Sequence, residues 1–152
     1  METTEYIIDK DIKVLCVRAS SFPNGVKAAH QKLHSIFSSS EPRTFYGISH
    51  SDKSGNILYW AAAEELHKGE GERLNLETFT IRKGKYISEL LEDWCKDEGL
   101  VGKTFKKLLA DPRIDKNGYC LEVYLNEKDM RCMVPLDPAY SLSTKEKNTL
   151  TD

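Results

Sequence analysis

A single acidic residue, Glu122, interrupts a segment that otherwise has the composition of a core strand, Tyr119-Cys-Leu-Glu-Val-Tyr-Leu125. Side chains alternate along a strand, so Cys120, Glu122 and Tyr124 are expected on one face. Both faces are mainly apolar or aromatic, which predicts that the strand is covered on both sides. An ionised carboxylate is costly to bury without a partner. Glu122 therefore lies at a sheet edge, pairs with a Lys or Arg of the fold, or binds a cationic ligand among aromatic rings.

Aromatic residues that could line such a site occur in both halves of the chain, mostly on predicted strands. They are Tyr46, Tyr59, Trp60, Tyr86, Tyr119 and Tyr124. Their hydroxyl or indole groups need hydrogen-bond partners where they are buried. These residues predict either an aromatic pocket between the halves or an ordinary core. Glu64 and Glu65, which end the Trp60 strand, could add a second carboxylate or form a solvated strand end.

Other reactive groupings are weak in this sequence. His30 and His34 have the spacing of two metal ligands on one helix face, but the Glu of an H-E-x-x-H motif and an obvious third ligand are missing. No serine lies in a G-x-S-x-G turn, and no glycine-rich phosphate loop of either common type occurs. We therefore expect no metal and no cofactor.

The composition bounds the class of protein and its partners. The chain has 152 residues, enough for one domain that buries a core without disulfides. Lys plus Arg (22) nearly balance Asp plus Glu (24), so the net charge of -2 gives no general attraction to nucleic acid or anionic membrane. The four cysteines are far apart, and neither a signal peptide nor a membrane-spanning apolar run is visible. We expect a cytoplasmic protein that binds neither nucleic acid nor membrane directly.

Apolar periodicity predicts two halves with the same order of elements. The first half has a strand over 12–19, a helix over 26–37 and a hairpin of strands 44–49 and 57–63. The second half has a strand over 74–81, a helix over 101–109 and a hairpin of strands 119–125 and 130–134. Residues 86–94 are ambiguous, because their apolar spacing favours a helix although residues 86, 88 and 90 would share one strand face.

Two strand–helix–strand–strand modules in tandem follow from this order, over about residues 12–65 and 74–136 of a single domain that spans 1–152. Hairpins with one helix per half predict an α+β fold, in which the helices cover one face of a largely antiparallel sheet. The polar segment 137–152 is expected to be a flexible tail.

Several short motifs, in this order and spacing, resemble the gyrase-inhibitor-like small-molecule-binding family, which includes the effector-binding domains of bacterial transcription activators. They are Tyr46-Gly47, Tyr59, Phe79-Thr-Ile-Arg-Lys-Gly-Lys-Tyr86 and Leu121-Glu-Val-Tyr124. The resemblance runs from about residue 12 to residue 136. It implies a duplicated module with pseudo-two-fold symmetry, a ligand groove between the halves and a strand that continues through the Tyr86 segment.

The resemblance also implies roles for individual residues. Glu122 matches the pocket carboxylate that faces cationic aromatic ligands in multidrug-sensing members. Tyr124 shares its strand face, and Trp60 is a neighbour of Tyr59, so only one of the latter two can point into the groove. Met130 stands where some relatives have a pocket tyrosine. The candidate ligand-binding residues are thus Glu122, Tyr46, Tyr59, Trp60, Tyr86 and Tyr124.

The function implied is that of a stand-alone small-molecule-binding protein for flat, largely apolar and cationic ligands. Only about a dozen residues precede the first predicted strand, too few for the DNA-binding domain that regulators of this family carry. Two alternatives stay open. Some family members resemble hydrolases of electrophilic cyclopropane-containing compounds, in which Glu122 would act as general acid or base. The gyrase-inhibitor branch implies a protein partner instead.

Overall fold

The computed structural model describes residues 3–37, 41–97 and 99–139. The strands are β1 (Thr4–Ile8), β2 (Ile12–Arg18), β3 (Phe45–Ser51), β4 (Ile57–Glu64), β5 (Glu77–Ile81), β6 (Gly84–Leu91), β7 (Cys120–Tyr124) and β8 (Met130–Pro135). The helices are α1 (Val26–Phe37), α2 (Glu70–Arg73), the short 3-10 helix η1 (Trp94–Lys96) and α3 (Leu100–Leu109).

All of these strands join one curled antiparallel sheet in the order β1-β6-β8-β7-β3-β4-β2-β5. The order is symmetric about its middle, where β3 of the first half pairs with β7 of the second. At the edges the halves exchange strands, because β1 pairs with β6 and β5 pairs with β2. The predicted α+β fold with a duplicated strand–helix–strand–strand module is confirmed. The first strand of the second module is β6, however, and the predicted strand 74–81 corresponds to β5, which pairs with β2 of the first half.

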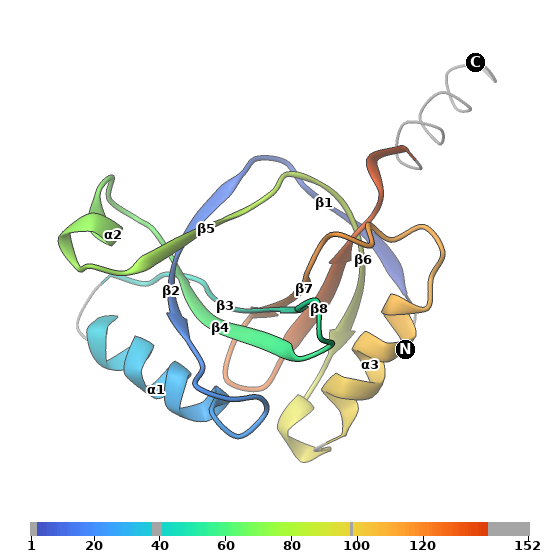
Figure 1. Ribbon diagram of the computed structural model, residues 1–152, viewed down its shortest axis with the longest axis horizontal. Coiled ribbons are helices and arrows are strands. Elements are labelled where there is room, and N and C mark those ends of the chain that lie inside the picture. Colours follow the sequence, from blue (N-terminus) through green and yellow to red (C-terminus); the bar gives the residue numbers. More distant parts are fainter. Residues whose placement is uncertain (1–2, 38–40, 98, 140–152) are drawn as a thin grey trace.

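The two long helices lie on the same side of the sheet, at its left and right in Figure 1. Helix α1 packs on β2 and β4 through Ala29, Leu33 and Phe37, which recur at the helical spacing of four residues. Helix α3 packs on β6 and β8, with Leu108 fully buried. The central strands β3 and β7 therefore lie between the two helices, on the face that both helices share.

The opposite face of the curled sheet encloses a separate apolar core. Its buried members come from all parts of the chain and are Val14, Cys16, Tyr46, Ile48, Ala62, Ile81, Tyr86, Tyr119, Leu121 and Met133. On central strand β7, Leu121 is fully buried in this core, whereas Cys120, Glu122 and Tyr124 on the helix face are only partly buried. The covering of both faces that the composition of the Glu122 segment predicts is therefore incomplete. Within the described part of the chain, no helix has the length and apolar character needed to span a bilayer.

Two sequence expectations need correction. The first strand of the chain is β1, which the sequence does not predict because Thr4–Ile8 is a short edge strand with exposed Tyr6 and Ile7. The strand expected from residue 74 begins only at Glu77, since α2 and its C-terminal turn occupy the preceding residues. The expected flexible tail over 137–152 falls mostly outside the described residues.

The ambiguous segment after residue 84 is strand β6, in agreement with the resemblance. Its helical spacing of apolar residues has a simple cause. Ile87 and Leu91 lie in the core beneath α3, while Tyr86 belongs to the core of the opposite face. A strand that is covered on both faces carries apolar residues at odd and even positions, and such a run imitates the periodicity of a buried helix.

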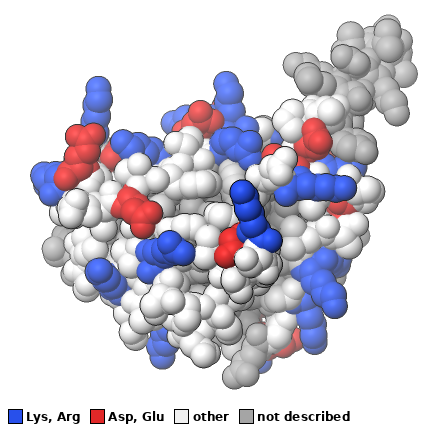
Figure 2. All heavy atoms as spheres, viewed as in Figure 1, with Lys and Arg blue, Asp and Glu red and all other residues white. Residues whose placement is uncertain are grey.

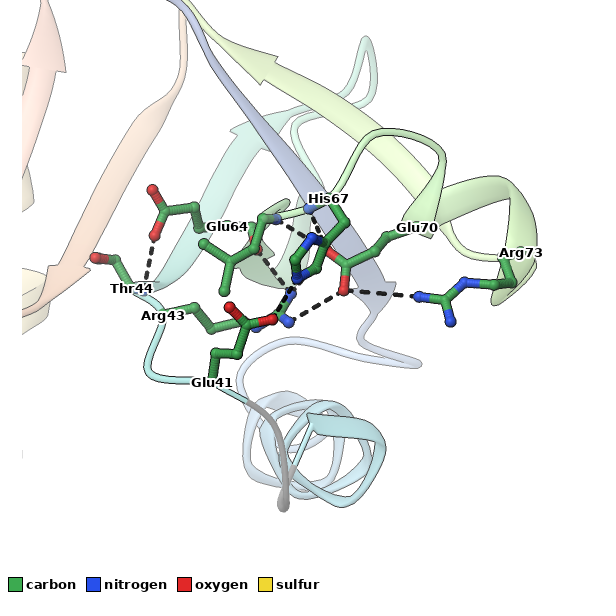
Figure 3. Close-up of polar contacts among 8 residues, drawn as sticks. Glu41, Arg43, Thr44, Glu64, His67, Glu70 and Arg73 are labelled. Carbon is green, nitrogen blue, oxygen red and sulfur yellow. Dashed lines mark hydrogen bonds and ion pairs between the residues drawn. The ribbon is translucent and has the colours of Figure 1, made fainter.

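A buried ion pair joins the segment before β3 to helix α2 (Figure 3). Arg43 donates 3.1 Å hydrogen bonds from Nη1 and Nη2 to the two carboxylate oxygens of Glu70, and these side chains are only 2% and 5% exposed. The backbone N–H groups of Leu66 and His67 also donate to Glu70 Oε1. The Arg43 guanidinium lies 4.2 Å from the centroid of the Phe37 ring at the end of α1. These contacts, above all the hydrogen bonds from Arg43, lower the pKa of Glu70 to about 2.

Charged side chains are dispersed on the face of the molecule that Figure 2 shows. On the face seen in Figure 2, Lys and Arg side chains stand at separate places with acidic side chains among them, and no continuous basic surface is visible there. This distribution agrees with the near balance of acidic and basic residues in the sequence.

We expect Glu70 to stabilise the fold only while it is ionised. Its ordinary pKa is 4.5, so its contribution is complete above that pH and is lost as the pH falls from 4.5 to about 2. Glu70→Gln should lower the free energy of unfolding at neutral pH by about 3 kcal/mol, because Arg43 then stays buried without its partner. Urea denaturation of both proteins between neutral pH and about pH 3 measures this difference.

The matched control is Glu72→Gln on the same helix, where the residue is exposed. This substitution should change the free energy of unfolding by less than about 0.5 kcal/mol. A Glu70→Gln deficit that stays constant from neutral pH to about pH 3 would contradict the assigned role of Glu70.

Candidate functional site

Glu122 lies in the middle of the sheet, on the face that carries the helices. On β7 it is directly opposite Gly47 of β3, at the junction between the two halves. Its neighbours along the same strand face, Cys120 and Tyr124, pack against the core beneath α3. Strand β7 is central, between β8 and β3. The explanation of Glu122 as a residue of a sheet edge is therefore wrong.

Two tyrosine hydroxyls hold the Glu122 carboxylate. Tyr59 on β4 donates a hydrogen bond of 2.7 Å and Tyr124 donates one of 2.5 Å, both to Oε1. Among the residues that the structure describes, no Lys or Arg forms an ion pair with Glu122, and no partner of its second oxygen, Oε2, is found. The carboxylate is thus oriented by neutral donors, and one of its oxygens stays available to a further group.

His30 of α1 extends this network. Its Nε2 lies 2.8 Å from the Tyr59 hydroxyl oxygen, and its ring makes edge contacts with the rings of Tyr59 and Tyr124. Because the Tyr59 hydrogen is donated to Glu122, His30 must donate its Nε2 hydrogen to the Tyr59 oxygen. Burial lowers the pKa of His30 to about 4, so the ring is neutral near pH 7, as this tautomer requires.

Burial also controls the protonation of Glu122. Desolvation raises the pKa of its carboxyl group, and the hydrogen bonds from Tyr124 and Tyr59 oppose this shift only in part. Burial and the nearby Glu122 charge raise the pKa of both tyrosines well above the ordinary range, so their hydroxyls stay protonated donors. A positive charge near Oε2 would favour the ionised form of Glu122.

Gly47 makes this arrangement sterically feasible. A Cβ atom at this position would lie 2.1 Å from the Tyr59 hydroxyl oxygen and 2.2 Å from Glu122 Oε1. Both polar groups therefore occupy the space above the glycine that a side chain would otherwise fill. A glycine within a strand often marks such a close approach.

Two further aromatic rings extend the cluster, one from each half. Phe22, in the loop before α1, stacks on Tyr59 with ring centroids 5.9 Å apart and is 43% exposed. Trp94 of η1 lies 5.9 Å from Tyr124, and its indole Nε1 is buried without a hydrogen-bond partner. Glu122 is thus centred between two aromatic pairs. We call Glu122, Tyr59, Tyr124, His30 and Gly47 the Glu122 cluster.

The structure separates the sequence-predicted site residues into two groups. Glu122, Tyr59 and Tyr124 come together on the helix face. Tyr46, Trp60 and Tyr86 belong to the opposite face or pack against its core. Strand alternation explains this division, since Tyr59 and Trp60 are successive residues of β4 and must point to opposite sides.

The three residues on the opposite face have other contacts there. The Tyr86 hydroxyl donates to the Arg82 carbonyl at 2.6 Å and lies 2.6 Å from the Tyr119 hydroxyl. Tyr46 is buried, and this burial raises its pKa to about 12. The Trp60 ring stacks on His50.

Sequence reasoning missed two members of the Glu122 cluster, Gly47 as a spacer and His30 as a hydrogen-bond donor. The solitary glycine in a strand was the available signal for the first. His30 was weighed as a metal ligand with His34 instead. In the described residues no three His, Cys, Asp or Glu side chains gather in a way that could hold a metal ion.

Met130 is fully buried on β8, directly across from Tyr124. Glu64 accepts a hydrogen bond from the Thr44 backbone, away from the cluster.

No protein-family model matches the sequence, and no curated protein sequence matches it significantly. Solved structures do share its fold. The EcmrR C-terminal domain superposes with a TM-score of 0.60 at 12% identity, over 90% of this chain and 97% of that domain. SAV2435 bound to tetraphenylphosphonium gives a TM-score of 0.60 at 9% identity, over 90% and 94%. A hydrolase from Listeria innocua gives a TM-score of 0.54 at 10% identity, over 90% and 92%.

This chain shares its fold with the EcmrR C-terminal domain and SAV2435. The similarity covers nearly the whole described chain, in agreement with the family resemblance of the short motifs. At these low identities the likeness concerns the fold alone, so any activity must be argued from the residues of the site.

Gly47→Ala should lower the free energy of unfolding by about 1–3 kcal/mol, because the added methyl group displaces Tyr59 and Glu122. Tyr59→Phe removes the hydroxyl oxygen that lies closest to the added methyl group. Gly47→Ala should therefore lower the free energy of unfolding by less in the Tyr59→Phe background. Urea denaturation of the two single variants and the double variant measures the coupling.

Gly102→Ala on α3 is the matched control, because nothing lies within 4 Å of the added methyl group. It should leave stability unchanged or raise it slightly, as alanine favours a helix. If the costs of Gly47→Ala and Tyr59→Phe are simply additive, the two side chains do not compete for the space above residue 47.

Proposed function

We propose that the Glu122 cluster is the binding site for a flat, largely apolar cation, and that this chain is a small-molecule-binding protein of the effector-binding type. The observation that carries the proposal is the Glu122 carboxylate itself. It lies in a central strand, two neutral hydroxyls orient it, and no basic side chain of the described residues neutralises it.

The physical reason favours a cationic ligand over a neutral one. Desolvation makes the ionised form of Glu122 unfavourable in the empty site, which the raised pKa of its carboxyl group expresses. A bound cation would compensate this cost, because opposite charges attract strongly where water is excluded. The rings of Phe22, Tyr59, Tyr124 and Trp94 would add contacts with apolar groups and with the positive charge.

A structural neighbour agrees with this choice of ligand. SAV2435 was solved with tetraphenylphosphonium, a monovalent cation surrounded by aromatic rings. Because the identity to SAV2435 is only 9%, its ligand is a reasonable probe for this chain rather than an assignment. The proposal for this site rests on Glu122, Tyr59 and Tyr124, since Tyr46, Trp60 and Tyr86 lie on the other side of the sheet.

Tetraphenylphosphonium should bind the wild type and raise its thermal unfolding temperature, because a ligand of the native state stabilises it by mass action. Glu122→Gln should weaken binding about tenfold to a hundredfold, as a charge-assisted contact is lost while the shape is kept. Calorimetric titration measures both affinities.

Two controls test the role of charge. Neutral triphenylphosphine oxide should bind the wild type and Glu122→Gln with the same affinity. The Glu72→Gln variant should bind the cation as tightly as the wild type does. Equal affinity of wild type and Glu122→Gln for the cation would refute the charge recognition.

The affinity for the cation should also depend on pH. Glu122 is protonated below its pKa, which lies above the ordinary 4.5, so affinity should fall as the pH is lowered through that value. The other titratable groups in contact respond elsewhere, because the pKa of His30 is about 4 and those of Tyr59 and Tyr124 are raised above their usual range. Glu122→Gln should show no such fall in affinity over the same pH range, which the same titrations in a series of buffers check.

A hydrolase is the second candidate function, and one observation favours it. A carboxyl group with a raised pKa beside two hydroxyl donors is a suitable general acid or base. One neighbour of the same fold is a hydrolase from Listeria innocua. Incubation with a cyclopropane-containing electrophile tests this candidate. Turnover that is lost in Glu122→Gln but kept in Glu72→Gln would favour the enzyme, and binding of the cation without turnover would favour the receptor.

A further inference from the structure

A cavity lies on the opposite face of the sheet from the Glu122 cluster. Its volume is about 180 Å³, and its walls come from β2, β3, β4 and β5. Cys16 and Ile48 are buried there and form its inner end, whereas His50 and Glu77 are exposed and mark its mouth. The sheet itself separates this cavity from the Glu122 cluster, because Trp60 lines the cavity while its neighbour Tyr59 belongs to the cluster.

The walls of the cavity are chiefly apolar and aromatic. Trp60, Phe79 and Ile48 supply the larger surfaces, and burial raises the pKa of the Cys16 thiol to about 12, so its inner end carries no charge. Contacts across three adjacent strands hold the Trp60 ring in place. His50 stacks on the ring with centroids 5.2 Å apart, and the Arg18 guanidinium lies 5.7 Å from its centroid. This wall is therefore already ordered before any ligand arrives.

Glu77 is the only acidic side chain among the residues that line the cavity. Among the described residues, Glu77 has no ion-pair partner. It is on edge strand β5, directly across from Cys16 of β2. The cavity thus combines aromatic surfaces, an uncharged inner end and a single unpaired carboxylate at its mouth.

The size of the cavity restricts the ligand. An apolar cavity of roughly 150 Å³ accommodates benzene, so a volume of about 180 Å³ fits one six-membered ring with a short substituent. A cation is favoured over an anion by Glu77, the only acidic side chain among the lining residues. Tetraphenylphosphonium, with four rings, is too large for this space. The two sites would therefore select different molecules.

We propose that this cavity is a second ligand site, which binds a small aromatic ammonium ion. The ring would lie against Trp60, Phe79 and Ile48, and the ammonium group would point to Glu77. This site does not depend on the function proposed for Glu122, because the two share no side chain.

The two tryptophans of the chain allow each site to be observed separately. Trp60 lines the cavity, and Trp94 contacts Tyr124 beside Glu122. In Trp94→Phe, the remaining tryptophan fluorescence reports the cavity alone. Benzylamine, which is an ammonium ion at pH 7.5, should change this fluorescence in a saturable manner.

Glu77→Gln in the Trp94→Phe background should weaken the binding of benzylamine at least tenfold, because the only acidic side chain that lines the cavity is replaced. Glu122→Gln and Glu72→Gln in the same background should leave the affinity unchanged. Neutral benzyl alcohol should bind the Trp94→Phe parent more weakly than benzylamine does. Its affinity should be the same for the parent and for the Glu77→Gln variant. Since Glu77 is exposed, its replacement should not unfold the protein, which urea denaturation of each variant verifies.

The indole N–H signals of the wild type in nuclear magnetic resonance spectra provide a measurement without the Trp94 substitution. Benzylamine should shift the signal of Trp60 and not that of Trp94. A shift of Trp94 that Glu122→Gln abolishes would overturn the proposal, because the amine would then bind the Glu122 cluster. A Trp60 response that Glu77→Gln does not weaken, or no response at all up to millimolar amine, would overturn it as well.

Discussion

The close approach of Glu122 and Tyr59 above Gly47 is the constraint on which the site depends. Their oxygen atoms occupy the volume of the missing side chain, at 2.2 Å and 2.1 Å from where its Cβ would lie. Gly47 and Glu122 are paired on the two central strands, one from each half, so the duplication of the module brings them together. The symmetric sheet places residues 47 and 122 opposite each other. Because residue 47 is a glycine, the space above it is free for the carboxylate of Glu122. An acidic residue at position 47 would have placed a second negative charge directly opposite Glu122.

The exchange of edge strands between the halves has a consequence for this centre. Because β1 extends the second half and β5 extends the first, neither module is complete without the other. The junction between β3 and β7 is therefore fixed from both edges of the sheet. Among the described residues no Lys or Arg pairs with Glu122, so the hydrogen bonds from Tyr59 and Tyr124 alone oppose the effect of desolvation on its pKa. Helices α1 and α3 cover the two sides and leave the central strands between them.

The period of two along β4 distributes aromatic residues to both faces of the sheet. Tyr59 turns to the Glu122 cluster, and Trp60 turns to the cavity beneath β5. One strand thus contributes to two chemically distinct environments, a buried hydroxyl network and an apolar cavity with a carboxylate at its mouth. Elsewhere the same alternation serves stability, as at Tyr86, which bonds to the Arg82 carbonyl and lies beside Tyr119. The aromatic content of a strand therefore does not indicate by itself which face, if any, binds a ligand.

The sequence by itself determined the α+β class, the duplication, and the presence of a lone acid, Glu122, in an apolar strand. Hydrophobic periodicity and turn residues act over short distances, so they identify α1, α3 and the two hairpins. A lone acid in an apolar strand is equally visible because its desolvation cost depends on its immediate neighbours. The tertiary structure alone decided which aromatic residues meet that acid, that His30 donates to Tyr59, and that Trp60 lines a cavity on the other face of the sheet. These outcomes depend on strand register and on the packing of helices between distant segments, and no local pattern encodes either of them.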